Sequence, residues 1–136
     1  MSKGLLFLCV ANSARSQMAE GIARSMAPPE TRIWSAGSRP TGVRPEAIAV
    51  LKDIGIDISG YGSKGINAIP VAEVGIVITL CAEEECPVFP GNVRRLHWGL
   101  RDPAAVTGSE QEVLAAYRES RDELLRRITA FLQGNC

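Results

Sequence analysis

The sequence predicts a single-domain α/β fold, with a parallel four-stranded sheet flanked by helices. Three observations carry this prediction: short apolar runs of strand length, helical periodicity between these runs, and a length of 136 residues, which suits one domain. Strands that alternate with helices indicate a doubly wound sheet with right-handed crossovers. The predicted domain spans residues 1–136, and the sequence contains neither repeats nor linkers.

Four strands are expected. Residues 5–10 form a continuous apolar run, which is typical of a strand buried on both faces. A second run at 74–80 is rich in β-branched residues, as central parallel strands are. Shorter apolar segments at 31–36 and 93–98 complete the predicted sheet.

Three helices are expected between and after these strands. The first begins near Ser16, shows an apolar residue at every fourth position, and ends before the two prolines at 28 and 29. The second starts at Pro45, a residue suited to a first helical turn, and runs to about residue 54. The third covers residues 109–132 with one apolar stripe, and residues 57–67 are predicted as loop.

The composition is that of a soluble globular protein. Hydrophobic residues make up 46% of the chain, charged residues 22%, and the formal net charge is zero, which argues against a nucleic-acid partner. The apolar run at 5–11 is far shorter than the roughly 18 to 20 residues of a membrane span. We therefore expect a cytoplasmic protein without membrane contact, and a monomer because no large apolar patch is evident.

The four cysteines at positions 9, 81, 86 and 136 favour reactive thiols over a structural disulfide framework, because the chain is not short or rich in cysteine. A zinc site is disfavoured, since Cys81 and Cys86 lack a second close pair of ligands and the chain has a single histidine, His97. No metal and no cofactor are expected.

Three chemically active residues follow predicted strands. Cys9 lies at the end of the first strand, Cys81 directly follows the strand that ends at residue 80, and Asp102 follows the last strand. In open parallel sheets, the loops beyond the carboxyl ends of the strands form the functional crevice. The sequence therefore predicts that these three side chains face one site.

The segment after Cys9 predicts an oxyanion loop between a strand and a helix. Backbone N–H groups and the positive end of the helix dipole cradle a phosphate-like anion at such a place. The guanidinium of Arg15 can grip two anion oxygens, the positive surroundings favour the Cys9 thiolate, and Ser16 can donate to the sulfur. The alternative to an oxyanion loop is a structural role, with a buried cysteine that packs as a small hydrophobic residue beside a solvated arginine. The predicted anion-binding residues are Val10, Ala11, Asn12, Ser13, Ala14, Arg15 and Ser16.

These motifs resemble a known family. Cys9, Arg15 and Ser16 match the oxyanion loop of low-molecular-weight protein tyrosine phosphatases, and residues 12–21 and 96–104 resemble the arsenate reductases of the thioredoxin-coupled type built on that fold. The resemblance extends over nearly the whole chain. It implies a low-molecular-weight tyrosine phosphatase-like fold and arsenate as the substrate.

The resemblance implies a relay of three thiols. Cys9 attacks arsenate while Asp102 protonates the leaving oxygen, Cys81 then attacks Cys9 to release arsenite, and Cys86 takes over the disulfide. An external reductant, either thioredoxin or glutaredoxin with glutathione, closes the cycle. Thioredoxin-linked members usually place six residues between the last two cysteines, whereas this chain places four. That departure puts the reductant and the role of Cys86 in question.

A second departure concerns potassium. Some members hold this ion behind the loop with residues that match Asn12, Glu20 and Ser35, and with an acid where this chain has Lys64. We expect the Lys64 ammonium to pair with Glu20 in place of the ion, so that no potassium is required. The Asn12 side chain is also expected to hold the loop in shape through backbone hydrogen bonds.

Two other functions would use some of the same residues. A protein tyrosine phosphatase would use Cys9, Arg15 and Asp102, but it leaves Cys81 and Cys86 without a role and expects an aromatic residue where the chain has Ala104. A non-enzymatic arsenic or redox sensor would bind through the three thiols and would need neither Arg15 nor Asp102. His97 is expected to be structural, Cys136 a free terminal thiol, and the glutamates at 83–85 a solvated loop or a helical turn.

Overall fold

The computed structural model describes residues 3–82 and 86–134, and its centre is a parallel sheet with the strand order β2-β1-β3-β4. Each strand lies within two residues of its predicted position, and the predicted fold class is confirmed. The strands are β1 (Gly4–Cys9), β2 (Ile33–Gly37), β3 (Val74–Thr79) and β4 (Arg94–His97).

The three predicted helices are also present, as α1 (Arg15–Met26), α2 (Pro45–Lys52) and α3 (Glu110–Leu132). The start of α3 is set by a capping box, in which Ser109 and Glu112 satisfy each other's backbone N–H groups. Short 3₁₀ helices at Ile66–Ala68, Val71–Glu73 and Pro103–Ala105 were not predicted, because three-residue helices leave no periodic pattern.

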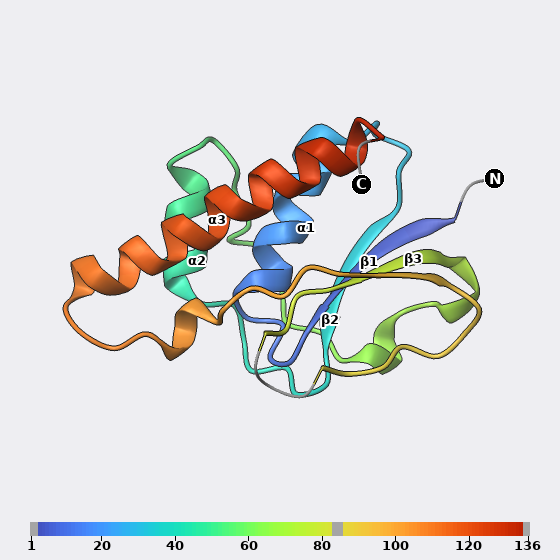
Figure 1. The fold of residues 1–136 in the computed structure, drawn as a ribbon, viewed down its shortest axis with the longest axis horizontal. Coiled ribbons are helices and arrows are strands. Elements are labelled where there is room, and N and C mark those ends of the chain that lie inside the picture. The colour runs from blue at the N-terminus through green and yellow to red at the C-terminus, as the bar shows by residue number, and fades with distance from the viewer. Residues whose placement is uncertain (1–2, 83–85, 135–136) are drawn as a thin grey trace.

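The two faces of the sheet are covered differently (Figure 1). Alternate β1 residues point to opposite sides, so that Phe7 packs into a core with residues of all three α-helices, whereas Leu8 packs into a smaller core. The smaller core is closed by Ile69, near the first 3₁₀ helix, and by the buried Phe89. The second face is therefore covered by 3₁₀ turns and loops rather than by an α-helix.

The strand order places the carboxyl end of β1 at the middle of one edge of the sheet. The chain leaves β1 into α1, with β2 on one side and β3 on the other, which makes this end a topological switch point. Leu80 N–H donates to the carbonyl of Leu8 at 2.9 Å, so the segment after β3 stays beside β1 as it approaches residue 81. Among the described residues, no helix has the length and apolar character needed to cross a membrane.

A buried tyrosine joins α3 to the rest of the core. Tyr117 is only 1% exposed, and burial, reinforced by the negative charge of Glu46, raises the pKa of its phenol to about 12. Arg44 opposes this shift and Asp102 adds to it, each more weakly. In the unfolded chain the phenol titrates near its ordinary value of about 10.

This pKa difference predicts a specific alkaline weakness. Below about pH 10 both states keep the phenol protonated, whereas between about pH 10 and 12 only the unfolded state ionises, so the free energy of unfolding falls by roughly 2 kcal/mol over that window. Urea unfolding at several pH values should show that Tyr117→Phe removes this part of the decline. An identical decline in the variant would contradict the prediction.

Candidate active site

The loop that connects β1 to α1 turns its carbonyl groups outward. Backbone N–H groups from the segment 39–44 donate to the carbonyls of Val10, Ala11 and Ser13, at 2.8, 3.1 and 2.9 Å. Because the C=O and N–H of a trans peptide point in opposite directions, the N–H groups that follow these carbonyls face the inside of the loop. The loop is therefore a cradle of donors for an anion, placed at the start of α1, whose N-cap Ala14 makes no side-chain cap.

The sharpest point of the loop is Asn12, whose φ of +48° is in the left-handed region that asparagine tolerates better than most residues. Gly37, at the end of β2, allows the loop to lie against the sheet. A Cβ atom on Gly37 would overlap the Val10 carbonyl oxygen and come within 2.8 Å of the Asn12 nitrogen. A residue with a side chain at position 37 would push the loop out of place.

The sulfur of Cys9 receives an oriented hydrogen bond. The Lys64 backbone N–H donates to Asn12 Oδ1 at 2.7 Å, which fixes the amide so that Nδ2 is the atom facing Ser16. Asn12 Nδ2 donates to Ser16 Oγ at 2.8 Å, and Ser16 Oγ lies 2.8 Å from Cys9 Sγ. The Ser16 hydroxyl hydrogen is thus available to the sulfur, and such a donor stabilises a thiolate.

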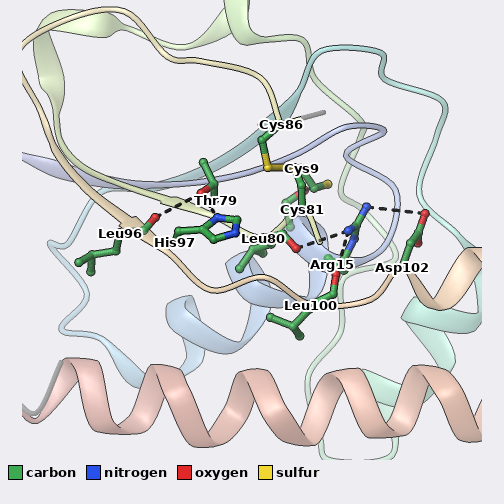
Figure 2. The surroundings of a disulfide bond; sticks show 11 residues. Cys9, Arg15, Thr79, Leu80, Cys81, Cys86, Leu96, His97, Leu100 and Asp102 are labelled. Carbon is green, nitrogen blue, oxygen red and sulfur yellow. Dashed lines mark hydrogen bonds and ion pairs between the residues drawn. A yellow bond between two sulfur atoms is a disulfide. The ribbon is translucent and has the colours of Figure 1, made fainter. Parts of the chain in front are cut away.

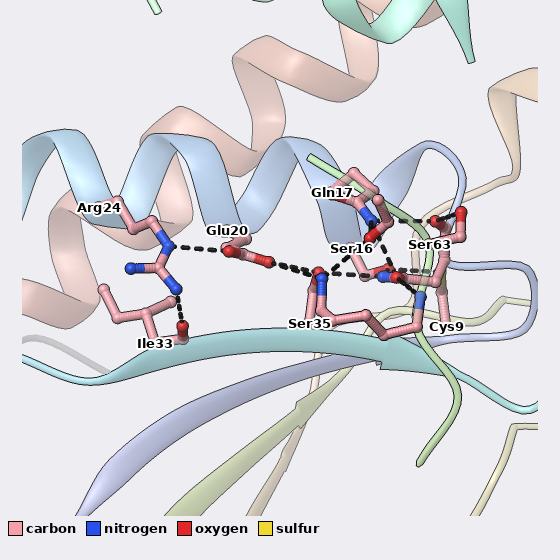
Figure 3. Close-up of polar contacts among 11 residues, drawn as sticks. Cys9, Ser16, Gln17, Glu20, Arg24, Ile33, Ser35 and Ser63 are labelled. Atoms are coloured by element: carbon pink, nitrogen blue, oxygen red, sulfur yellow. Dashed lines mark hydrogen bonds and ion pairs between the residues drawn. The ribbon is translucent and has the colours of Figure 1, made fainter. Parts of the chain in front are cut away.

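The same amide has a second arm that leads to a buried carboxylate (Figure 3). Asn12 Nδ2 also donates to Ser35 Oγ at 3.0 Å, and Ser35 in turn donates to Glu20 Oε1 at 2.6 Å. Glu20 is 5% exposed and is neutralised by Arg24 at 2.8 Å and by the Lys64 ammonium at 3.6 Å. A buried carboxylate needs such partners, because desolvation of an unpaired charge is costly.

Arg15 lies at the mouth of the cradle and faces Asp102 (Figure 2). Its side chain is almost fully buried, and Nη1 donates to the carbonyls of Leu80 and Leu100, at 3.4 and 3.1 Å. Nη2 lies 3.6 Å from Asp102 Oδ2, while the other carboxylate oxygen of Asp102 accepts from the Ala104 N–H at 3.0 Å. The guanidinium is therefore oriented by groups that follow β3 and β4, and the half-exposed Asp102 remains open to the crevice.

A disulfide joins Cys81 to Cys86, whose Cα atoms are 5.5 Å apart, and Cys9 beside it is a free thiol (Figure 2). Cys81 is fully buried and Cys86 is half-buried. Cys9 ends β1 and Cys81 follows two residues after the end of β3, and these two strands are paired up to Leu8 and Thr79. The three described cysteines therefore lie close to the oxyanion loop, as expected for thiols that exchange a disulfide.

Comparisons with known proteins agree with this geometry. The model of the family "Low molecular weight phosphotyrosine protein phosphatase" matches residues 4–134. An arsenate reductase of Halalkalibacterium halodurans is 42% identical over 133 residues, which cover 96% of each chain. The chain belongs to the arsenate reductases of this phosphatase family. A solved arsenate reductase in the phosphate-binding state, 30% identical, superimposes with a TM-score of 0.79 over 98% of this chain and 99% of its own.

A thioredoxin-dependent arsenate reductase of Corynebacterium glutamicum gives a TM-score of 0.63 at 27% identity. The match covers 96% of this chain and 63% of that longer protein. The fold of this chain is therefore similar to that of a member that is described as thioredoxin-dependent.

In this member of the family, the residues predicted from the sequence occupy one site. The structure brings together Cys9, Arg15, Asp102 and the Cys81–Cys86 disulfide, and it places residues 10–14 around the cradle. The predicted pairing of Lys64 with Glu20 is confirmed. His97 contacts Thr79 Oγ1 at 2.7 Å through Nδ1. The glutamates at 83–85 and Cys136 lie outside the described residues.

Some residues of the site carry no recognisable sequence signal. Asn12 was expected to hold the loop through backbone hydrogen bonds, and it accepts one from the Lys64 N–H, but its amide also directs Ser16 and Ser35. Ser63 and Gln17 contact the Asn12 carbonyl and were not predicted. Position 63 is 51 residues away from Asn12 in the sequence, so only the folded chain reveals its contact.

The potassium ion of some family members does not fit this chain. The Lys64 ammonium lies 3.6 Å from the carboxylate of Glu20, one of the residues expected to hold the ion, and donates to the Gly62 carbonyl at 3.0 Å. A potassium ion added at this position would be repelled by the ammonium. The positive charge behind the loop is thus part of the chain itself.

The orientation of the Asn12 amide predicts the reactivity of the nucleophile. Asn12→Gly removes the side chain and keeps the backbone, since glycine adopts positive φ at no steric cost. Alkylation of Cys9 in the reduced protein by iodoacetamide at pH 7 should slow about fivefold to tenfold, the value of one oriented hydrogen bond. Peptide mass spectrometry measures this rate, and Asn67→Gly, at an exposed position, is the matched control. Equal rates for wild type and Asn12→Gly would contradict the assignment.

The Lys64–Glu20 pair predicts that the turnover of the protein does not depend on potassium. Replacing potassium chloride by tetramethylammonium chloride at constant ionic strength should leave the turnover of the wild type unchanged. Lys64→Asp removes the ammonium and adds a carboxylate, so its turnover should become dependent on potassium. Turnover of the wild type that rises with potassium would show that the ammonium does not occupy the cation position.

Proposed function

We propose that this chain reduces arsenate to arsenite, with Cys9 as the nucleophile and a disulfide relay through Cys81 and Cys86. The observation that carries the proposal is the Cys81–Cys86 disulfide beside a free Cys9 at the base of an oxyanion cradle. A phosphatase needs the cradle and its nucleophile but has no use for two further thiols at the same place. Membership among the arsenate reductases supports the same reaction.

The cradle suits arsenate as a tetrahedral oxyanion. Inward N–H groups of residues 11–14 bind its oxygens, and Arg15 supplies a bidentate positive charge. Arsenate bound in this way presents its arsenic to Cys9 Sγ, which the Ser16 hydroxyl holds at 2.8 Å. Proximity and electrostatic stabilisation both favour attack by the thiolate.

The Cys9 thiolate forms a sulfur–arsenic bond, and one arsenate oxygen, protonated by Asp102, leaves as water. The Cys81 thiolate then attacks Cys9 Sγ, and the electron pair of the sulfur–arsenic bond passes to arsenic, which becomes arsenite. A Cys9–Cys81 disulfide remains. Attack of the Cys86 thiolate on Cys81 Sγ transfers the disulfide to Cys81–Cys86 and releases Cys9 as a thiolate.

The structure, with its Cys81–Cys86 disulfide and free Cys9, corresponds to the last of these reaction steps, before an external thiol reduces the disulfide. The disulfide forms across a sequence separation of five residues, which supports a role for Cys86 despite the short segment. Because Cys81 is buried and Cys86 is half-buried, an external thiolate reaches Cys86 more easily. We propose thioredoxin as this reductant, or glutaredoxin with glutathione, in the reducing cytoplasm, acting on a monomer whose residues 1–136 form one domain.

A low-molecular-weight protein tyrosine phosphatase remains the alternative. It would use the same Cys9, Arg15 and Asp102, with hydrolysis of a phospho-cysteine by water. The position that follows the Asp102-Pro103 pair is Ala104, which offers a phosphotyrosine ring no aromatic surface. The two functions are therefore distinguished by whether turnover requires Cys81.

The relay predicts distinct results for each cysteine. Arsenate-dependent oxidation of NADPH should be followed with a thioredoxin system and, separately, with glutaredoxin plus glutathione. Cys9→Ser and Cys81→Ser should fall below about one per cent of the wild-type rate, since both thiols precede arsenite release. Cys86→Ser should complete one turnover and then stop as a Cys9–Cys81 disulfide. Hydrolysis of an aryl phosphate that survives Cys81→Ser, without arsenate reduction by the wild type, would leave the phosphatase.

A further inference from the structure

The Asn12–Ser13 peptide is held from behind by two side chains. Ser63 Oγ lies 2.7 Å from the Asn12 carbonyl oxygen, and Gln17 Nε2 donates to the same oxygen at 3.2 Å. Gly42 N–H donates to Ser63 Oγ at 2.8 Å. Since this backbone group can only donate, the Ser63 hydroxyl hydrogen is directed at the Asn12 carbonyl. The loop at 60–65 is thereby tied both to the oxyanion loop and to the segment 39–44.

Gln17 is kept in this orientation at a cost. Its Nε2 faces three acceptors, which are the carbonyls of Asn12 and Gly62 and the side-chain oxygen of Asn12. Its own Oε1 is buried and has no hydrogen-bond partner among the described residues. An unsatisfied buried amide oxygen destabilises the folded state, so the donors aimed at Asn12 are retained against an energetic penalty.

The orientation of this peptide decides what faces the anion. With the Asn12 carbonyl turned outward toward Ser63, the N–H of Ser13 points into the cradle. Rotation of the same peptide would turn the carbonyl oxygen inward, where it would repel an oxyanion. Asn12 has a positive φ, a conformation that is strained for a residue with a side chain and needs surrounding contacts to persist.

We propose that Ser63 is a positioning residue for anion binding, which acts together with Gln17 as a clasp on the Asn12–Ser13 peptide. The clasp keeps the Ser13 N–H directed at the bound oxyanion. The role of Ser63 is separate from the contacts that activate Cys9, because Ser63 donates to the Asn12 carbonyl, whereas the Asn12 side-chain amide that directs Ser16 is fixed by the Lys64 N–H and by Gln17 Nε2. The inference rests on the proposed function only in that it concerns the same cradle.

The separation of the two roles defines the test. Inorganic phosphate is the probe, and its dissociation constant is measured from the protection of Cys9 against iodoacetamide in the reduced protein. Ser63→Ala should weaken phosphate binding about fivefold, which corresponds to one hydrogen bond. The alkylation rate without phosphate should stay within about twofold of the wild type, since the Ser16 contact is retained. Ser63→Thr, which keeps the hydroxyl, should restore phosphate binding.

Controls separate positioning from general damage. Ser59→Ala, at an exposed position of the neighbouring segment, should bind phosphate as the wild type does. In the arsenate assay, Ser63→Ala should raise KM while kcat stays within about twofold. Wild-type phosphate affinity in Ser63→Ala, or no protection in the wild type, would overturn the clasp. Because phosphate protection needs no reductase turnover, a failure of the proposed reaction would remain distinguishable.

Discussion

The side-chain amide of Asn12 is the contact on which the arrangement of the site depends. The Lys64 backbone N–H and Gln17 Nε2 both donate to the Asn12 side-chain oxygen, which decides which end of this amide accepts and which donates. Its donors then meet the hydroxyl groups of Ser16 and Ser35, so the direction of every later hydrogen bond is fixed. A single orientation of the Asn12 amide therefore sets both the hydrogen bonds that lead to Cys9 and those that lead to the buried Glu20.

The fold makes this contact available because three loops converge at one end of the sheet. β1 delivers the oxyanion loop, β2 ends in a glycine that leaves room for it, and the segment before the first 3₁₀ helix returns beside both. Gly37 and Gly65 form an isolated bridge that extends β2 toward this segment. The site is thus supported by backbone pairing, which holds geometry more precisely than side-chain contacts alone.

Much of this architecture was predictable from periodicity. The buried run that became β1 and the capped apolar stripe of α3 are strong local signals, and the position of Cys9 between a strand and a helix indicated the anion cradle. The covering of the second sheet face was not predictable, because three-residue 3₁₀ helices and the loop around Phe89 have no period. Ser63 was missed for a related reason, since its contact joins distant segments.

Because the disulfide lies on Cys81 and Cys86, binding of an anion does not distinguish oxidised from reduced molecules of this protein. Oxidation is stored on Cys81 and Cys86, so an oxidised molecule keeps both a free Cys9 and an intact oxyanion loop. A spent molecule therefore keeps the anion-binding loop that a competent molecule uses. Titration with an oxyanion measures their sum, and only a count of free thiols gives the fraction able to complete a turnover.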